Sequence, residues 1–266
     1  MLEIKDVYKT FNKGTVNEKI ALNGVDLKLN DGDFCTIIGG NGAGKSTMLN
    51  AIAGVWPVDR GVIFLGDKDV TGLPEHKRAS YLGRVFQDPM MGTVADMEII
   101  ENLAIAARRG KKRTLMWNVT KAEKEKYREM LAQFDLGLEN RMTSKVGLLS
   151  GGQRQAITLL MATIKKPQLL LLDEHTAALD PKTAAKVLEL SDKIIEENKL
   201  TALMVTHNMH DAIAHGNRLI MMNNGKIIFD IQGEEKKKLK TSDLLEKFSV
   251  ASGGQELDND RMLLSK

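Results

Sequence analysis

The stretch FCTIIGGNGAGKSTMLNAIA, residues 34–53, joins a short apolar run to a helical run through a glycine-rich loop. Phe34–Ile38 is rich in apolar and β-branched residues, which predicts a buried strand. We predict a helix at Thr47–Ala53. Between the two, Gly39–Ser46 satisfies the pattern G-x-x-x-x-G-K-S. A strand, this loop and a helix in this order predict a loop that binds phosphate groups.

Glycines in such a loop allow backbone N–H groups to turn toward phosphate oxygens, and the N-terminus of the helix adds partial positive charge. We expect Lys45 to reach the β- and γ-phosphates of a nucleotide and Ser46 to bind Mg²⁺. The alternative is a glycine-rich turn that ends in Lys-Ser by chance, which the flanking strand and helix disfavour. The predicted nucleotide-binding residues are Gly39, Gly40, Asn41, Gly42, Ala43, Gly44, Lys45, Ser46 and Thr47.

The bulk composition is that of a globular protein. The chain has 266 residues, a net charge of +3 and 42% hydrophobic residues, enough for one large domain or two small ones. A charge so close to balance gives no whole-chain argument for nucleic acid or an anionic membrane as the partner. No apolar run approaches the roughly 18 residues of a membrane span. The single cysteine, Cys35, lies in the predicted buried strand, so we expect a buried thiol in a reducing cytoplasm.

The remaining apolar runs predict an α/β fold. Leu2–Tyr8 and Ile20–Leu29 indicate an antiparallel β start. Leu169–Leu172 and Thr201–Thr206 are short apolar runs separated by longer helical stretches, which is typical of parallel strands buried on both faces. The fold class is therefore predicted as a P-loop NTPase core of the RecA-like kind with an N-terminal antiparallel β subdomain.

An inserted α-helical subdomain is expected between Pro89 and Leu149, where strand-like runs stop. Helices are predicted at Met97–Arg108 and Thr120–Leu136. Arg218–Met222 and Lys226–Asp230 flank an Asn-Gly turn and predict a hairpin. The predicted division is an ATP-binding core at residues 1–88 and 150–232, the insertion at residues 89–149, and a C-terminal helix with a flexible tail at residues 233–266.

Two acids follow one of the predicted core strands. Asp173 and Glu174 end the run LLLLDE, at the edge of the sheet where α/β proteins bind ligands. Asp173 is suited to Mg²⁺, and Glu174, expected to point the other way along the strand, can orient the attacking water. The alternative, a helix cap, is disfavoured beside a phosphate loop.

Two further polar residues follow strands. His207 comes after Thr201–Thr206 and can donate a hydrogen bond to a γ-phosphate. Gln87 follows the strand-like run Leu82–Phe86, and its amide oxygen can bind Mg²⁺ or water. A lone histidine would usually be structural, but its position after a core strand favours the functional interpretation, whereas an isolated glutamine carries little weight.

A serine and two glycines open an otherwise apolar helix in LLSGGQRQAI, residues 148–157, which weakens the start of that helix. The tetrapeptide Ser-Gly-Gly-Gln occurs again at Ser252–Gln255, in a polar tail that follows no helical lobe. We interpret the second copy as a coincidence.

Together these features resemble the ATP-binding-cassette (ABC) family over residues 1 to about 230. The resemblance implies an Mg²⁺-dependent ATPase. It places the signature motif at Leu149–Gln153, the catalytic glutamate at Glu174 and the switch histidine at His207. It assigns Asp173 as the magnesium aspartate and Gln87 as the glutamine of the glutamine loop. It assigns Asp180 as the aspartate at the dimer contact.

The resemblance also implies that two cassettes face each other head to tail, so that the signature of one covers the ATP held by the other. Ser150 would donate its hydroxyl and Gly151 and Gly152 their backbone N–H groups, with Gln153 beside them. Phe11 would stack on adenine, with Tyr8 a weaker candidate.

One departure from the family is His175, which stands where the family commonly has proline. The histidine is either a tolerated backbone change or an influence on the pH dependence.

The family's partners are transmembrane permease subunits. The inserted lobe and the glutamine loop bind these subunits at the cytoplasmic face of the membrane. The resemblance implies a second ATPase subunit, with a homodimer allowed because both half-sites are intact, and a substrate-binding protein. Import is favoured over export, and the chain looks similar to amino-acid importers of the tryptophan/tyrosine type. Arg108–Arg113 would touch lipid headgroups or acidic loops, or else be solvated, and Met90 and Met91 would adapt to a partner groove.

The alternative is a cassette ATPase that acts on nucleic acid or the ribosome. Such relatives usually carry long coiled coils or two tandem cassettes. This sequence has neither a second phosphate loop nor helical segments long enough for sustained heptads. We therefore expect no nucleic-acid partner.

Overall fold

The computed structural model describes residues 1–110 and 119–251. The contacts divide the chain into two compact units, one of Met1–Arg78 with Lys199–Lys266 and one of Ala79–Asn198. The expected helical insertion, residues 89–149, falls inside the second unit. No helix in the described residues is long and apolar enough to cross a membrane.

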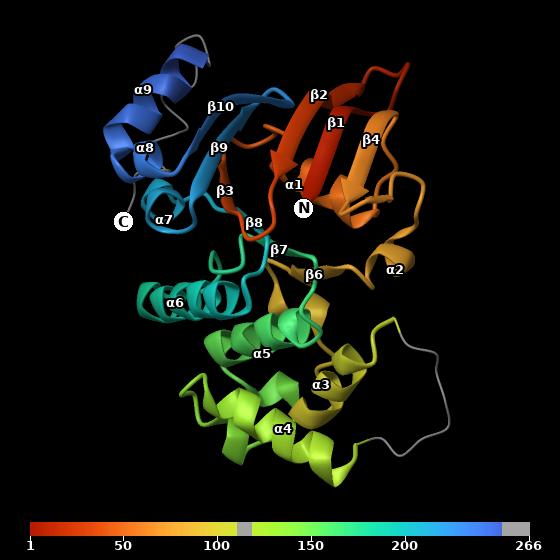
Figure 1. Ribbon diagram of the computed structural model, residues 1–266, viewed down its shortest axis with the longest axis vertical. Helices are drawn as coiled ribbons and strands as arrows, with labels where there is room; N and C mark the ends of the chain where they lie inside the picture. The colour runs from red at the N-terminus through yellow and green to blue at the C-terminus, as the bar shows by residue number, and fades with distance from the viewer. Residues whose placement is uncertain (111–118, 252–266) are drawn as a thin grey trace. The chain divides into compact units, whose positions relative to one another are not determined.

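The first unit opens with an antiparallel sheet whose strands are neighbours in the order β2-β1-β4-β5 (Figure 1). The two predicted strands are confirmed, and each extends beyond its expected limits. The alternating burial of β2 buries one of its two faces. The strands are β1 at Leu2–Phe11, β2 at Lys19–Leu29, β4 at Arg60–Leu65 and β5 at Lys68–Asp69.

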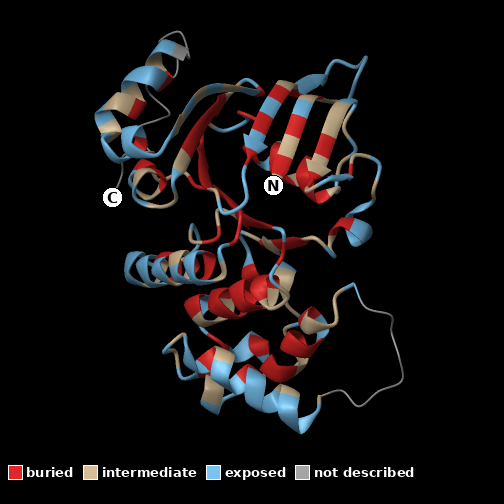
Figure 2. Ribbon diagram, viewed as in Figure 1, coloured by how far each residue is buried: buried red, intermediate tan, exposed pale blue. Residues whose placement is uncertain are grey.

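Four further strands of this unit are neighbours in the order β10-β9-β3-β8. β3 pairs in parallel with β8 and β9, and all its residues are buried, as predicted (Figure 2). Cys35 is buried, as predicted, and burial raises the pKa of its thiol to about 12. The strands are β3 at Phe34–Ile38, β8 at Ala202–Val205, β9 at Arg218–Asn223 and β10 at Lys226–Gln232.

The turn between β9 and β10 confirms the predicted hairpin. Asn224 has φ 46° and Gly225 has φ 73°, which is the left-handed pair of a type I′ turn.

The helices of the first unit follow its strands. α1, at Lys45–Ala53, begins two residues before the predicted start. The expected single C-terminal helix is wrong in detail, because two helices occur there and the second packs by Leu244 and Phe248 into a core cluster. That packing could not be read from a short polar segment. The other helices are α2 at Glu75–Arg78, α7 at Met209–Ala214, α8 at Glu234–Lys237 and α9 at Thr241–Ala251.

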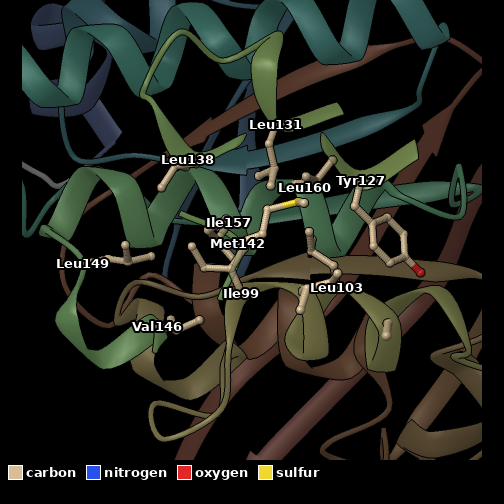
Figure 3. Close-up of a cluster of buried hydrophobic side chains, with 12 residues drawn as sticks. Ile99, Leu103, Tyr127, Leu131, Leu138, Met142, Val146, Leu149, Ile157 and Leu160 are labelled. Carbon is tan, nitrogen blue, oxygen red and sulfur yellow. The ribbon is translucent and has the colours of Figure 1, made fainter. Parts of the chain in front are cut away.

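The second unit pairs two parallel strands, β6 and β7, and is otherwise helical. Its helical part has a core of its own, in which α3 and α4 pack against α5 (Figure 3). The elements are β6 at Leu82–Val85, β7 at Leu169–Asp173, α3 at Ile99–Ala107, α4 at Lys121–Ala132, α5 at Gly151–Thr163 and α6 at Pro181–Asn198, with short 3₁₀ turns η1 at Pro89–Gly92, η2 at Leu138–Asn140 and η3 at Val146–Leu148.

α4 ends earlier in the chain than the sequence predicts. The helix stops at Ala132 rather than Leu136, because Asp135 and Gly137 adopt left-handed φ values of 51° and 68°. The start is as expected, with Thr120 and Glu123 forming a capping box.

Candidate functional site

The phosphate loop connects β3 to α1 through glycines whose positions are fixed by neighbouring backbone. Gly39 has φ 150° and Gly44 has φ 104°. A Cβ on Gly39 would lie 2.2 Å from the carbonyl oxygen of Met222, and one on Gly44 would lie 2.5 Å from that of Ala21. Packing and backbone conformation therefore require both glycines, whatever the phosphates that the sequence predicts at this loop.

Lys45 is held at this loop. Its Nζ donates hydrogen bonds to the carbonyl oxygens of Gly39 at 2.6 Å and Gly40 at 3.1 Å, and the residue is 5% exposed. Gly44, which precedes the helix, has no side chain with which to cap it, so the first N–H groups of α1 remain suited to an anion. A buried cation beside a bare helix start fits the phosphates of a nucleotide.

The loop is also covered by the C-terminal helix α9. The Cζ atom of Phe248 lies 3.3 Å from the position of a Cβ on Gly40. The sequence reasoning missed this contact, because the two residues are far apart in the chain.

Phe11, the predicted adenine platform, is already part of an aromatic pair. Its ring meets that of Trp56 edge to face, with centroids 4.9 Å apart. Both candidate rings also have a cation nearby: Nζ of Lys9 lies 5.5 Å from the ring centroid of Phe11, and the guanidinium of Arg60 lies 5.4 Å from that of Tyr8. The sequence reasoning missed the pairing of Phe11 with Trp56, because no motif reveals it.

His207 lies two residues after the end of β8 and is half-buried. The next residue, Asn208, caps α7 by accepting hydrogen bonds from the backbone N–H groups of His210 at 2.8 Å and Asp211 at 3.3 Å. The capped turn fixes the backbone of His207 at the end of a buried strand, as predicted.

In the second unit, the parallel strands β6 and β7 bring Gln87 and Asp173 to the same edge of the sheet. Asp173 ends β7 and is 15% exposed by its side chain, and its Oδ2 lies 3.3 Å from Nη2 of Arg84. Gln87 is exposed. The sequence reasoning missed Arg84, because an arginine inside an apolar strand matches no motif.

Glu174 does not continue the strand, so the expectation that it points the other way along β7 is wrong. β7 ends at Asp173, and Glu174 has a left-handed φ of 46°. Its carbonyl oxygen accepts a hydrogen bond from the N–H of Ala177 at 3.0 Å. A non-glycine residue in this region costs on the order of 1–3 kcal/mol, and such strain tends to occur at functional sites.

His175, the departure from the family, is anchored inside the unit. It is 2% exposed, and its Nε2 lies 3.0 Å from Oγ of Ser191. Because the Ser191 hydroxyl donates to the carbonyl oxygen of Val187 at 2.8 Å, it accepts its other bond from Nε2–H. The histidine therefore ties the turn after Glu174 to α6, which favours the structural alternative.

The signature motif forms a self-contained helix cap. Ser150 Oγ accepts from the N–H of Gln153 at 3.3 Å, and Gln153 Oε1 accepts from the N–H of Ser150 at 3.2 Å. This is a capping box. As an acceptor, the Ser150 oxygen keeps its own O–H for another partner.

The two signature glycines differ. Gly151 is exposed, whereas Gly152 is buried, and a Cβ on Gly152 would lie 2.1 Å from Cγ2 of Thr183. Gly152 is thus required for the packing of α5 against α6, which the sequence reasoning had not foreseen. Asp180 caps the start of α6, and hydrogen bonds from Thr183 hold the pKa of its carboxyl below 3.8.

In the basic run Arg108–Arg113, Arg108 and Arg109 both make polar contacts within the protein. Residues 111–113 of this run lie outside the described residues. Nη2 of Arg108 lies 3.4 Å from Oε1 of Glu123, and Nη2 of Arg109 donates to the carbonyl oxygen of Ala162 at 3.2 Å. Burial lowers the pKa of Arg109. The second tetrapeptide, Ser252–Gln255, also lies outside the described residues.

A family model, sequence relatives and solved structures all identify the same family for this chain. A family model described as "ABC transporter" matches residues 22–177. The chain is 42% identical over 254 residues to a "Tyrosine transport ATP-binding protein" of Clostridioides difficile, covering 94% of this chain and 100% of that protein. It is 35% identical over 258 residues to the "Methionine import ATP-binding protein MetN" of Clostridium tetani, covering 92% of this chain and 76% of that protein.

Solved structures agree. The dimeric ATP-binding cassette MJ0796 bound to ADP and Pi has a TM-score of 0.74 at 30% identity, covering 87% of this chain and 98% of that one. The ADP conformation of the cassette MJ1267 has a TM-score of 0.75 at 28% identity, covering 93% and 98%. This chain therefore belongs to the ABC transporter family, in which it is an ATP-binding ATPase subunit.

Proposed function

We propose that the chain drives the import of an amino acid, with tyrosine or a similar aromatic amino acid as cargo. The observation that carries this proposal is the 42% identity to a tyrosine transport ATP-binding protein along that protein's whole length. The relatives compared above are transport and import subunits, which favours this reading over the alternative of a cassette acting on nucleic acid or the ribosome.

The proposed nucleotide contacts follow from the donor chemistry of each residue. Lys45 and the N–H groups of the phosphate loop bind the phosphates. Ser46, Asp173 and Gln87 offer hydroxyl, carboxylate and amide oxygens, a hard oxygen set that fits Mg²⁺. When bound, Mg²⁺ neutralises charge on the phosphates.

For hydrolysis, we assign Glu174 to orienting and polarising the attacking water and His207 to donating a hydrogen bond to the γ-phosphate. The strained backbone of Glu174 supports a functional role for that residue. Phe11, with Trp56 beside it, is the proposed platform for adenine.

A second copy of the chain completes each site in this proposal. The exposed Gly151 and the free O–H of Ser150 open a helix of 13 residues, and they would cover the nucleotide held by the partner's phosphate loop. ATP then favours the closed dimer, and hydrolysis with phosphate release favours the open one. The energy that moves the permease comes from this difference in association.

Transmembrane permease subunits are the proposed partners at the cytoplasmic face, with a substrate-binding protein on the far side. Met90 and Met91, 38% and 71% exposed, follow Gln87 and offer adaptable apolar side chains for that contact.

The test is to purify the chain with its membrane partner and to measure ATP hydrolysis in liposomes with the substrate-binding protein. We expect tyrosine to stimulate hydrolysis and accumulate inside, whereas lysine does neither. Hydrolysis that nucleic acid stimulates and aromatic amino acids do not would contradict the proposal.

A further inference from the structure

Arg84 is placed by strand register on the face of the sheet that carries Asp173. β6 and β7 run in parallel with Arg84 opposite Leu171. Side chains alternate along a strand, so Leu171 and Asp173 point to one face, and Arg84 points there with them. On that face, Nη2 of Arg84 lies 3.3 Å from Oδ2 of Asp173, and the two side chains are only 14% and 15% exposed.

The rest of the guanidinium is poorly satisfied. Its Nε is buried and has no hydrogen-bond partner in the part of the chain that the structure describes. Its central carbon lies 4.5 Å from the ring centroid of Phe86. A partly buried ion pair with one long contact and one unmet donor adds little stability, because both charges have lost water. Stability alone therefore does not account for this arginine.

We propose that Arg84 competes with Mg²⁺ for the Asp173 carboxylate. Arg84 thereby sets the Mg²⁺ concentration at which the nucleotide is bound as its magnesium complex. The inference rests on the proposed role of Asp173 as a magnesium ligand. Arg84 is a positioning residue, since it acts through that carboxylate.

The physical reason is charge. A carboxylate that neutralises a guanidinium is a weaker ligand, and a divalent ion beside an arginine is repelled by it. The Phe86 ring already contacts the guanidinium, and this cation–π attraction does not depend on the contact with Asp173. Removing the arginine takes away one positive charge that opposes Mg²⁺ at this carboxylate.

The experiment titrates Mg²⁺ against the full-length chain with a fluorescent, slowly hydrolysed ATP analogue. In Arg84→Met, the Mg²⁺ concentration at half-saturation is expected to fall about fivefold, which is the shift that one partly exposed charge pair produces. Arg84→Lys keeps the charge and should stay near the wild type. Affinity for the analogue in EDTA should change less than the Mg²⁺ midpoint does. An unchanged or higher Mg²⁺ midpoint in Arg84→Met, or a loss of affinity in EDTA, would overturn the inference.

Asp173→Asn separates this inference from the proposed function. In that background, adding Arg84→Met should lower the Mg²⁺ midpoint less than it does in the wild-type chain, because only the direct repulsion between the arginine and the ion is left to remove. If Asp173→Asn by itself keeps the wild-type Mg²⁺ dependence, the magnesium role of Asp173 is wrong. If Asp173→Asn raises the midpoint and Arg84→Met does not lower it, only the competition is wrong. Arg84→Gln replaces Arg84→Met if thermal unfolding shows that the methionine variant does not fold.

Discussion

The phosphate loop and the signature motif both place glycines at the N-terminus of a helix, but they satisfy that helix differently. α1 follows Gly44, which cannot cap it, and Lys45 supplies a buried charge beside the loop. α5 is capped by its own Ser150 and Gln153. The first region is built to receive an anion, and the second is stable without one. This difference supports the proposal that the phosphate loop holds the nucleotide and that the signature motif completes the site of a partner.

The largest expected effect is in the phosphate loop. Gly44→Ala places a methyl group 2.5 Å from the carbonyl oxygen of Ala21 at a left-handed φ. Neither backbone segment can move away without a large cost in free energy, so we expect a loss of about 3 kcal/mol in the free energy of unfolding. Urea unfolding measures it. The matched control is Gly32→Ala, which has a left-handed φ but open space around it and should cost less.

The next effect is in the signature motif and can be reversed. Gly152→Ala brings a methyl group 2.1 Å from Cγ2 of Thr183, and we expect a loss of about 2 kcal/mol from overpacking. Thr183→Ser removes that methyl and keeps the hydroxyl, so the double variant should recover most of the stability in the same unfolding assay. If the double variant is as unstable as Gly152→Ala, the packing account of Gly152 is wrong.

Ser150→Asp sharpens the comparison by separating stability from function. Aspartate is as good an N-cap as serine, so the free energy of unfolding should stay within about 0.5 kcal/mol of the wild type. The added carboxylate would face the partner's phosphate, so ATP-driven dimerisation should be lost. Ser150→Ala is the control, and it should cost about 1 kcal/mol by loss of the cap. Normal ATP turnover in Ser150→Asp would contradict the role of Ser150.

The smallest expected effect is the pH dependence of the cap on α6. The pKa of Asp180 lies below its ordinary value of 3.8, chiefly because of its side-chain hydrogen bond with Thr183. Its stabilisation is therefore complete above pH 3.8 and is lost as the pH falls below that value. Urea midpoints from pH 6 to pH 3 should fall less steeply for Asp180→Asn, which keeps an acceptor and does not titrate. Equal slopes for the two proteins would contradict the stabilisation of α6 by the ionised Asp180 carboxylate.

Short sequence patterns predict correctly the elements that are fixed by interactions between residues close together in the chain. The strand Phe34–Ile38 and the hairpin around Asn224 agree with the structure, because short-range chemistry fixes each of them. The motif residues lie at strand ends and helix starts, as expected. The exception is Glu174, whose left-handed φ has no local signal.

Contacts between distant segments were out of reach of the sequence. Trp56 beside Phe11, Phe248 over Gly40 and Arg84 beside Asp173 each join residues far apart along the chain. Nothing in the periodicity of either segment encodes such a pair. The same holds for Gly152, whose missing side chain matters because of Thr183 on the next helix.

The most direct measurement asks whether two chains share each site. A Glu174→Gln, Lys45→Ala chain is mixed with a Glu174→Gln, Ser150→Arg chain, and sedimentation is followed with ATP and Mg²⁺. Head-to-tail sharing leaves one complete site in the mixed dimer, so we expect dimers in the mixture and monomers for either chain alone. Dimers formed equally by either chain alone, or no dimers in the mixture under conditions where the Glu174→Gln chain dimerises, would contradict it.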